Sequence, residues 1–153
     1  MSAPTERLAA LGLELPSLPP PVFKYVPAIR QGDLVFASGQ TPTVDGRLTV
    51  TGKLGAGVSV EEGQQAARLC VLNCVAAAAS AAGGVDNITQ VLKLTGYVAS
   101  AAGFTDQPLV INGASQLLEE IFGDAGRGAR AALGLAELPG GAPVEVDLIV
   151  AVR

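Results

Sequence analysis

The sequence has only two long helical runs among several strand-like segments, and this imbalance limits how the chain can fold. The first run covers 59–82, where Ser59 and Glu62 have the spacing of a capping box. The second covers 108–122, with Pro108 acceptable in a first turn. Its apolar residues recur along one helix face: Val110, Ala114, Leu117, Leu118 and Ile121. Each helix must bury that face against another element, and the strands are the available partners.

Strand-like segments precede, separate and follow the two helices. They cover 26–30, 34–38, 88–98, 129–135 and 144–152. Gln31-Gly32-Asp33 joins the first two segments, as in a hairpin. The order of segments predicts an α+β fold in which two long helices pack on one face of a single sheet.

The first 24 residues have a different pattern. Residues 3–12 fit a short amphipathic helix, and the Pro-rich run 16–21 prevents its continuation. We therefore predict an N-terminal extension and Pro-rich loop over 1–24 and a core over 25–153, within a single domain.

Two of the strand-like segments are apolar at consecutive positions. Leu34–Ala37 and Leu148–Val152 therefore present carbon to both faces of the sheet. Two helices can cover only one of these faces. Because large exposed apolar patches usually mark interfaces, we expect another copy of the chain to cover the second face. A site on that face would then lie between subunits.

Composition excludes several classes of function. Ten Lys and Arg against fourteen Asp and Glu give a net charge of −4, which argues against nucleic acid or a membrane as partner. The chain has no histidine, so His-based triads, His-ligated zinc and a His general base are excluded. Cys70 and Cys74 are too few for a zinc site, and we expect two buried apolar groups. With no signal-peptide pattern and no apolar span of about 18 residues, we expect a cytoplasmic protein.

One guanidinium lies within an otherwise apolar strand-like segment. Arg130 stays protonated at any working pH, and its planar fork fits a carboxylate through two parallel hydrogen bonds. The next strand supplies Glu145 and Asp147. Two interpretations follow. Either Arg130 neutralises one of these carboxylates in a structural ion pair, or Arg130 and Glu145 form a site for a small anionic molecule.

Three groups of residues, in this order, resemble the RidA/YjgF family of reactive intermediate deaminases. They are Leu34–Gln40, then Ala129–Ala132 with Leu138-Pro139, and finally Val144–Asp147. The resemblance covers 25–152, and Asn112-Gly113-Ala114-Ser115 is similar to a helix of a longer subgroup with an N-terminal extension.

The resemblance implies a chorismate-mutase-like fold of the Bacillus type with a mixed sheet, and a homotrimer with clefts between subunits. It also implies hydrolysis of 2-imino acids or enamines to 2-keto acids and ammonia, as in 2-iminobutanoate/2-iminopropanoate deaminases. No cofactor or metal is implied. By matching position, Arg130 would hold the substrate carboxylate, and Glu145 would orient or activate the attacking water.

The same resemblance implies further residues that contact substrate. Tyr25 and Ser38 would line the cleft, Asn112 would shape its entrance, and Ala132 would contribute backbone groups. Each also fits an ordinary structural role: packing for Tyr25, and capping or local hydrogen bonding for Asn112.

The chain departs from the family pattern at two places. Phe23-Lys24 precedes Tyr25, where the family commonly has Gly-Pro, and Ala131-Ala132 replaces a common Ser and Cys. These departures leave the physiological substrate open. A non-catalytic module that binds a small acid is the alternative function. The endoribonuclease activity attached to some relatives fits poorly with the acidic charge balance and the missing histidine.

Overall fold

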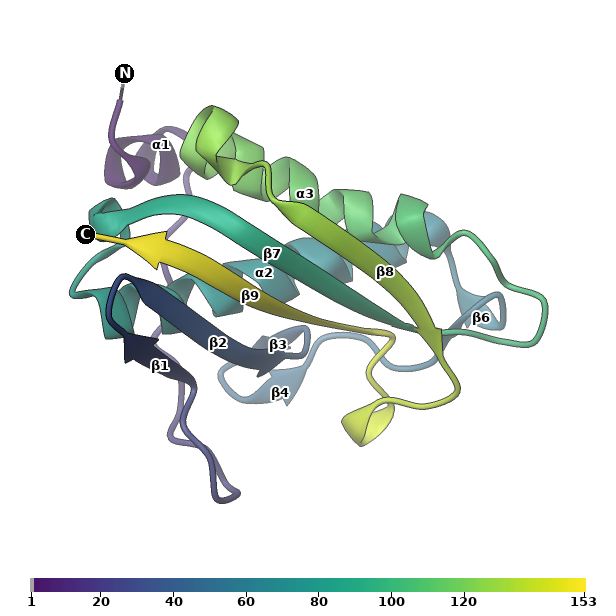
Figure 1. Cartoon of the computed structure of the whole chain (residues 1–153). Helices are drawn as coiled ribbons and strands as arrows, with labels where there is room; N and C mark the ends of the chain where they lie inside the picture. Colours follow the sequence, from purple (N-terminus) through teal and green to yellow (C-terminus); the bar gives the residue numbers. More distant parts are fainter. Residues whose placement is uncertain (1) are drawn as a thin grey trace.

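A computed structural model describes residues 2–153 and places five strands in one mixed sheet (Figure 1). The strand order is β1-β2-β9-β7-β8, with β7 and β8 parallel and all other neighbours antiparallel. The strands are β1 (Ala28–Gln31), β2 (Leu34–Gln40), β7 (Ile88–Ala99), β8 (Ala129–Leu135) and β9 (Val144–Val152). The predicted α+β class and mixed sheet are confirmed.

The helices are α1 (Pro4–Ala10), α2 (Val60–Ala82) and α3 (Gln107–Phe122). α2 and α3 pack against each other and against the same face of the sheet, behind it in Figure 1. Burial alternates along β9, where Val146 and Leu148 are buried beneath the helices and Glu145 is only half-buried on the other side. We call this other side the open face. The prediction of two long helices on one face is confirmed.

Local chemistry sets the ends of α2. The Ser59 hydroxyl accepts a hydrogen bond from the Glu62 N–H at 3.1 Å, and the Glu62 carboxylate accepts one from the Ser59 N–H at 2.8 Å. The helix ends at Gly83, whose φ of 79° is the left-handed conformation that glycine adopts at low cost. Cys70 and Cys74 lie on this helix as fully buried free thiols, as predicted.

Two sequence predictions require correction. The first strand begins at Ala28 and includes Gln31, because the hairpin turn needs only Gly32 and Asp33, with Gly32 at φ 60°. An apolar span of 18 residues does exist, since among residues 2–153 α2 alone is long and apolar enough to cross a membrane. Its best window has a mean hydropathy of 1.3, and 67% of that window is buried inside the fold, as in the core helix of a domain.

Short elements complete the chain between the larger ones. They are β3 (Thr43–Val44), β4 (Arg47–Leu48), β5 (Lys53–Leu54), β6 (Gly57–Val58) and three 3-10 turns, Val85–Asn87, Gly123–Gly126 and Pro139–Gly141. The N-terminal extension packs on the core. Leu8 of α1 is buried, and the Thr5 N–H donates to Asp86 at 2.9 Å.

Candidate active site

Arg130 extends from the edge strand β8 to α3. Its Nη1 donates to the Asn112 side-chain oxygen at 2.8 Å and to the Ser115 hydroxyl at 3.2 Å. Its Nη2 donates to the Pro108 carbonyl at 3.4 Å. Asn112 and Ser115 are three residues apart, so they lie on the same face of the helix. The guanidinium is therefore positioned by neutral acceptors of a single helix.

The contacts of Arg130 leave part of its guanidinium for a ligand. The residue is exposed, and it lines a hollow of about 110 Å³ with Leu94, Ser115, Glu119, Gly126, Arg127 and Gly128. Within residues 2–153, Nε makes no hydrogen bond and Nη2 makes one, to the Pro108 carbonyl. Neighbouring Glu119 is paired with Arg127 instead, at 2.9 Å. The fork of Nε and Nη2 is thus available for a carboxylate.

Glu145 lies on the open face, at a second and larger hollow of about 560 Å³. Tyr25, Ser38 and Pro139 line this hollow too. The Ser38 hydroxyl donates to the Val26 carbonyl at 2.6 Å, which fastens the segment after Tyr25 to β2. Three of the residues predicted to contact substrate are therefore brought together here.

The electrostatic environment of Glu145 favours its protonated form. Burial, and then the charge of Asp147 two residues along β9, raise the pKa of the Glu145 carboxyl above its ordinary value. Asp147 accepts a 2.7 Å hydrogen bond from the Tyr97 hydroxyl. Burial and this carboxylate raise the pKa of Tyr97 to about 12, so the phenol stays neutral. Glu145 is consequently a stronger base, when ionised, than an exposed glutamate.

The predicted site is divided between the two hollows. Arg130 is aligned with Leu94 of β7, which faces the helices, whereas Glu145 is aligned with Tyr97 on the open face. Arg130 therefore lies on the helix side of the sheet and Glu145 on the other. The structural ion pair with Glu145 or Asp147 is absent from the ion pairs described for residues 2–153.

Ala132 and Asn112 are the remaining predicted residues. Ala132 lies two positions after Arg130 on β8, aligned with Gly96 and partly buried against the core. Asn112 contacts Arg130 directly, so its side chain does more than shape an entrance.

Sequence reasoning assigned no role to Gly39 and Asn73, which both shape the Glu145 hollow. A Cβ on Gly39 would lie 2.5 Å from Oε2 of Glu145, so the carboxylate occupies the space that a larger residue would need. Asn73, buried on α2, donates to the carbonyls of Thr41 and Thr43 at 3.2 and 3.0 Å. Gly39 lay within the Ser38-Gly39-Gln40 motif, whereas Asn73 resembled any other residue on a buried helix face.

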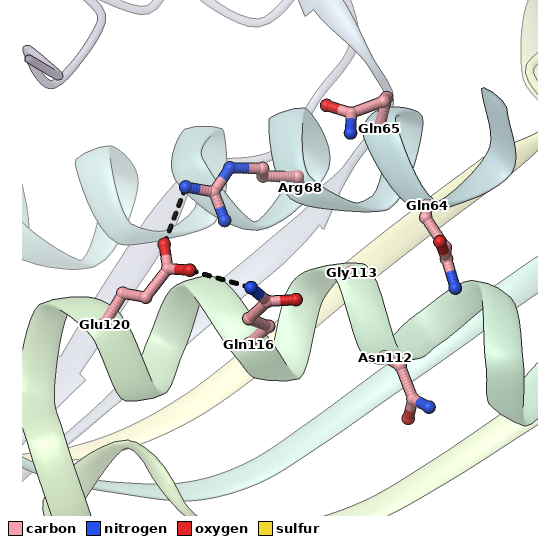
Figure 2. A pocket seen from close by; sticks show the side chains of 7 residues that line it. All are labelled: Gln64, Gln65, Arg68, Asn112, Gly113, Gln116 and Glu120. Atoms are coloured by element: carbon pink, nitrogen blue, oxygen red, sulfur yellow. Dashed lines mark hydrogen bonds and ion pairs between the residues drawn. The ribbon is translucent and has the colours of Figure 1, made fainter. Parts of the chain in front are cut away.

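A polar groove between α2 and α3 adjoins Asn112 (Figure 2). Its centre is the ion pair of Arg68 and Glu120 at 2.6 Å, and Gln116 donates to the same carboxylate at 3.0 Å. In Figure 2 the Asn112 side chain points away from this pair. The opposite charges of Arg68 and Glu120 thus neutralise each other within the groove. Among residues 2–153, no three Cys, Asp or Glu side chains form a cluster that could hold a metal ion.

Comparisons with known proteins agree with this fold. Residues 5–147 match the family model described as "YjgF/chorismate_mutase-like, putative endoribonuclease". TCP17 from Trypanosoma cruzi is 44% identical over 144 residues, 94% of this chain and 90% of that protein. A crystal structure from Shewanella oneidensis MR-1 with the same endoribonuclease description is 36% identical, with a TM-score of 0.94, covering 99% of this chain and 100% of that one. E. coli TdcF with bound serine is 25% identical, with a TM-score of 0.64, covering 92% and 98%.

The mixed sheet with two helices on one face has the architecture of the chorismate-mutase-like class. The chain belongs to the YjgF/chorismate-mutase-like family, as the sequence predicted.

Proposed function

We propose that this protein hydrolyses 2-imino acids, or their enamine tautomers, to 2-keto acids and ammonia. The observation that supports this best is the state of Arg130, which is exposed and held by neutral groups only. A substrate carboxylate on its free fork gains a charge-assisted bidentate contact of about 1.5–3 kcal/mol. Arg130 is thus the carboxylate-binding residue of the proposal.

Glu145 supplies the base. The imine carbon is already electrophilic, so hydrolysis mainly requires a water held next to it and a route for ammonia to leave. The Glu145 carboxylate accepts a proton from this water while the water oxygen bonds to the carbon. Glu145 then returns this proton to the nitrogen, which gives a carbinolamine. A second proton passes from the carbinolamine hydroxyl through Glu145 to the nitrogen, the carbon–nitrogen bond breaks as the carbonyl forms, and ammonia leaves. One water is consumed, and no group is oxidised or reduced.

In this proposal the site forms between subunits of a homotrimer. Arg130 and Glu145 line different hollows of one protomer, so each needs the other from a neighbouring copy. The open face exposes 59% of Ile29 and 40% of Phe36, and association would remove this apolar surface from water. Serine bound to TdcF carries a carboxylate and a nitrogen on adjacent carbons, which supports a site for such molecules in a relative.

The test is the release of 2-keto acid from imines that an amino acid oxidase generates in situ. We expect wild type to accelerate release above the spontaneous rate. Arg130→Ala should lower kcat/KM by about 10- to 100-fold, because each 1.4 kcal/mol of lost binding is about tenfold. Arg30→Ala, which removes an exposed cation of β1, is the matched control and should behave like wild type. Equal rates for wild type and Arg130→Ala would exclude the proposed site.

The endoribonuclease description of the family makes RNA cleavage the second candidate. The net charge of −4 disfavours binding to a phosphate backbone. RNA cleavage that survives stringent repurification and is lost in Arg130→Ala would support this candidate instead. Thermal stabilisation by a 2-keto acid without ammonia release would indicate a non-catalytic binding module.

A further inference from the structure

We propose that the substrate carries a bulky, uncharged apolar side chain, of the size found in leucine or phenylalanine. This inference rests on the proposed function, because it concerns the hollow beside Glu145. That hollow measures about 560 Å³. A one-carbon side chain displaces little more than one water, which occupies about 30 Å³. A small imino acid would therefore leave the hollow largely filled with water.

The lining of the hollow is apolar where the Pro-rich loop forms it. The apolar lining residues include Leu18, Pro19, Val22, Phe23, Tyr25 and Pro139. Within one protomer Val22 is 89% exposed and Phe23 78% exposed, so the rest of the chain leaves most of their apolar surface uncovered. A large apolar substrate group would cover that surface, and a methyl group would not.

The charge of the hollow excludes a second anionic group on the substrate. Among the described residues, Glu145 is the one charged side chain of the lining. Lys24 follows Phe23 in the chain but is not part of the lining. The cation that the proposed function brings here, Arg130 of a neighbouring copy, already holds the substrate carboxylate. An acidic side chain on the substrate would therefore meet the like charge of Glu145 with no cation left to pair with it.

Part of the loop has a restricted backbone before any substrate binds. Pro19, Pro20 and Pro21 are consecutive, each with φ fixed by its ring. A preformed wall loses little conformational entropy when a ligand packs against it. In this proposal Phe23, in the Phe23-Lys24 pair that stands where the family commonly has Gly-Pro, changes specificity while Arg130 and Glu145 are kept.

The experiment compares kcat/KM for leucine-derived and alanine-derived imines. We expect the leucine-derived imine to be favoured by at least about tenfold, the discrimination that a few methylenes provide in an apolar pocket. In Val22→Ala/Phe23→Ala this ratio should fall by about tenfold. Both side chains are largely exposed, so truncation leaves the core intact. Any loss of assembly would lower both rates and leave their ratio unchanged. Leu11→Ala, another exposed apolar residue, is the control and should keep the wild-type ratio.

Binding of the product acids separates this inference from the proposed function. Thermal stabilisation by 4-methyl-2-oxopentanoate should exceed that by pyruvate, and the difference should vanish in Val22→Ala/Phe23→Ala. Turnover with a preference for the alanine-derived imine would overturn the inference and leave the deaminase proposal standing. Selective binding of the larger acid without turnover would overturn the deaminase proposal and leave the preference for a large apolar group standing. Equal stabilisation by both acids, or none by either, would overturn the inference.

Discussion

The Glu145 carboxylate occupies space that exists only because residue 39 has no side chain. We expect Gly39→Ala to fold, since its Cβ would displace only the mobile tip of Glu145, at a cost under about 1 kcal/mol. The displaced carboxylate would no longer hold the attacking water correctly. A misplacement of about 1 Å can cost about 100-fold, so kcat should fall by about that factor.

Gly134→Ala is the matched control for this substitution. Gly134 also lies on a strand of the sheet, and its Cβ would lie 2.7 Å from Nε2 of Gln107 and 3.2 Å from the Ser100 hydroxyl, both at the ends of side chains. Imine hydrolysis and urea unfolding should be measured for both variants. Equal activity of Gly39→Ala and wild type would show that the position of Glu145 is irrelevant to the reaction.

The raised pKa of Glu145 predicts a shifted pH dependence. Glu145 acts as a base when deprotonated, so kcat/KM should rise with pH through its raised pKa. Asp147→Asn removes the neighbouring charge and should move this rise to lower pH, while burial, the larger cause, remains. Asp45→Asn also removes one carboxylate, at a turn residue with φ 51° that Asn tolerates, and should leave the midpoint unchanged.

The same pKa fixes the sign of a stability effect. Between the ordinary and the raised pKa, folded Glu145 holds a proton that the unfolded chain has lost. Its contribution to the free energy of unfolding is therefore present at low pH and is lost as pH rises through that window. If kcat/KM and the free energy of unfolding of Asp147→Asn each changed with pH as they do in wild type, this account of Glu145 would be contradicted.

Individual residues differed in how far the sequence could predict them. Arg130 was visible as a lone charge in an apolar strand, and Ser115 could have been found from its spacing of three from Asn112. The hydrogen bond between Tyr97 and Asp147 could not have been found from the sequence, because it joins residues fifty positions apart through the register of β7 and β9. Register is set by tertiary pairing that periodicity does not specify.

At the scale of elements, α2 holds the chain that follows β2. Asn73 donates to the carbonyls of Thr41 and Thr43, which both line the Glu145 hollow. Its own side-chain oxygen is buried without a partner among the described residues. The helix therefore positions one wall of the hollow through a single amide group.

We expect Asn73→Leu to destabilise the fold by about 1–3 kcal/mol, measured by urea unfolding. The hydrogen bonds to Thr41 and Thr43 are lost and the carbonyls of both residues lose a buried donor, while removal of the unpaired oxygen offsets part of the cost. Gln65→Leu makes a similar change at an exposed position of α2 and should stay within about 0.5 kcal/mol of wild type. Equal stability of Asn73→Leu and wild type would show that the loop does not depend on this contact.

The elements themselves were largely predictable. The ranges 129–135 and 144–152 match β8 and β9. In β9 every second residue is buried, and this burial enforces its apolar pattern. The start of β1 was misplaced, since Val26 is as strand-like as the residues that pair. Only the partner strand decides where pairing begins.

At the scale of the molecule, the separation of Arg130 from Glu145 has a consequence for mixed assemblies. If each site takes Arg130 from one subunit and Glu145 from the next, Arg130→Ala and Glu145→Gln impair complementary halves. Each variant alone should be nearly inactive. Random co-assembly in equal amounts should return about a quarter of the wild-type activity, because each interface has about one chance in four of combining both intact residues.

The co-expressed and purified oligomer should be assayed for imine hydrolysis, and its mass measured to confirm assembly. Arg130→Ala co-expressed with the double variant Arg130→Ala/Glu145→Gln is the control. It contains no intact Arg130, so no interface can be complete. Recovery in the first mixture and none in the second would require a shared site. If the two hollows of one protomer served one reaction, every site would lack a residue, and both mixtures would remain inactive.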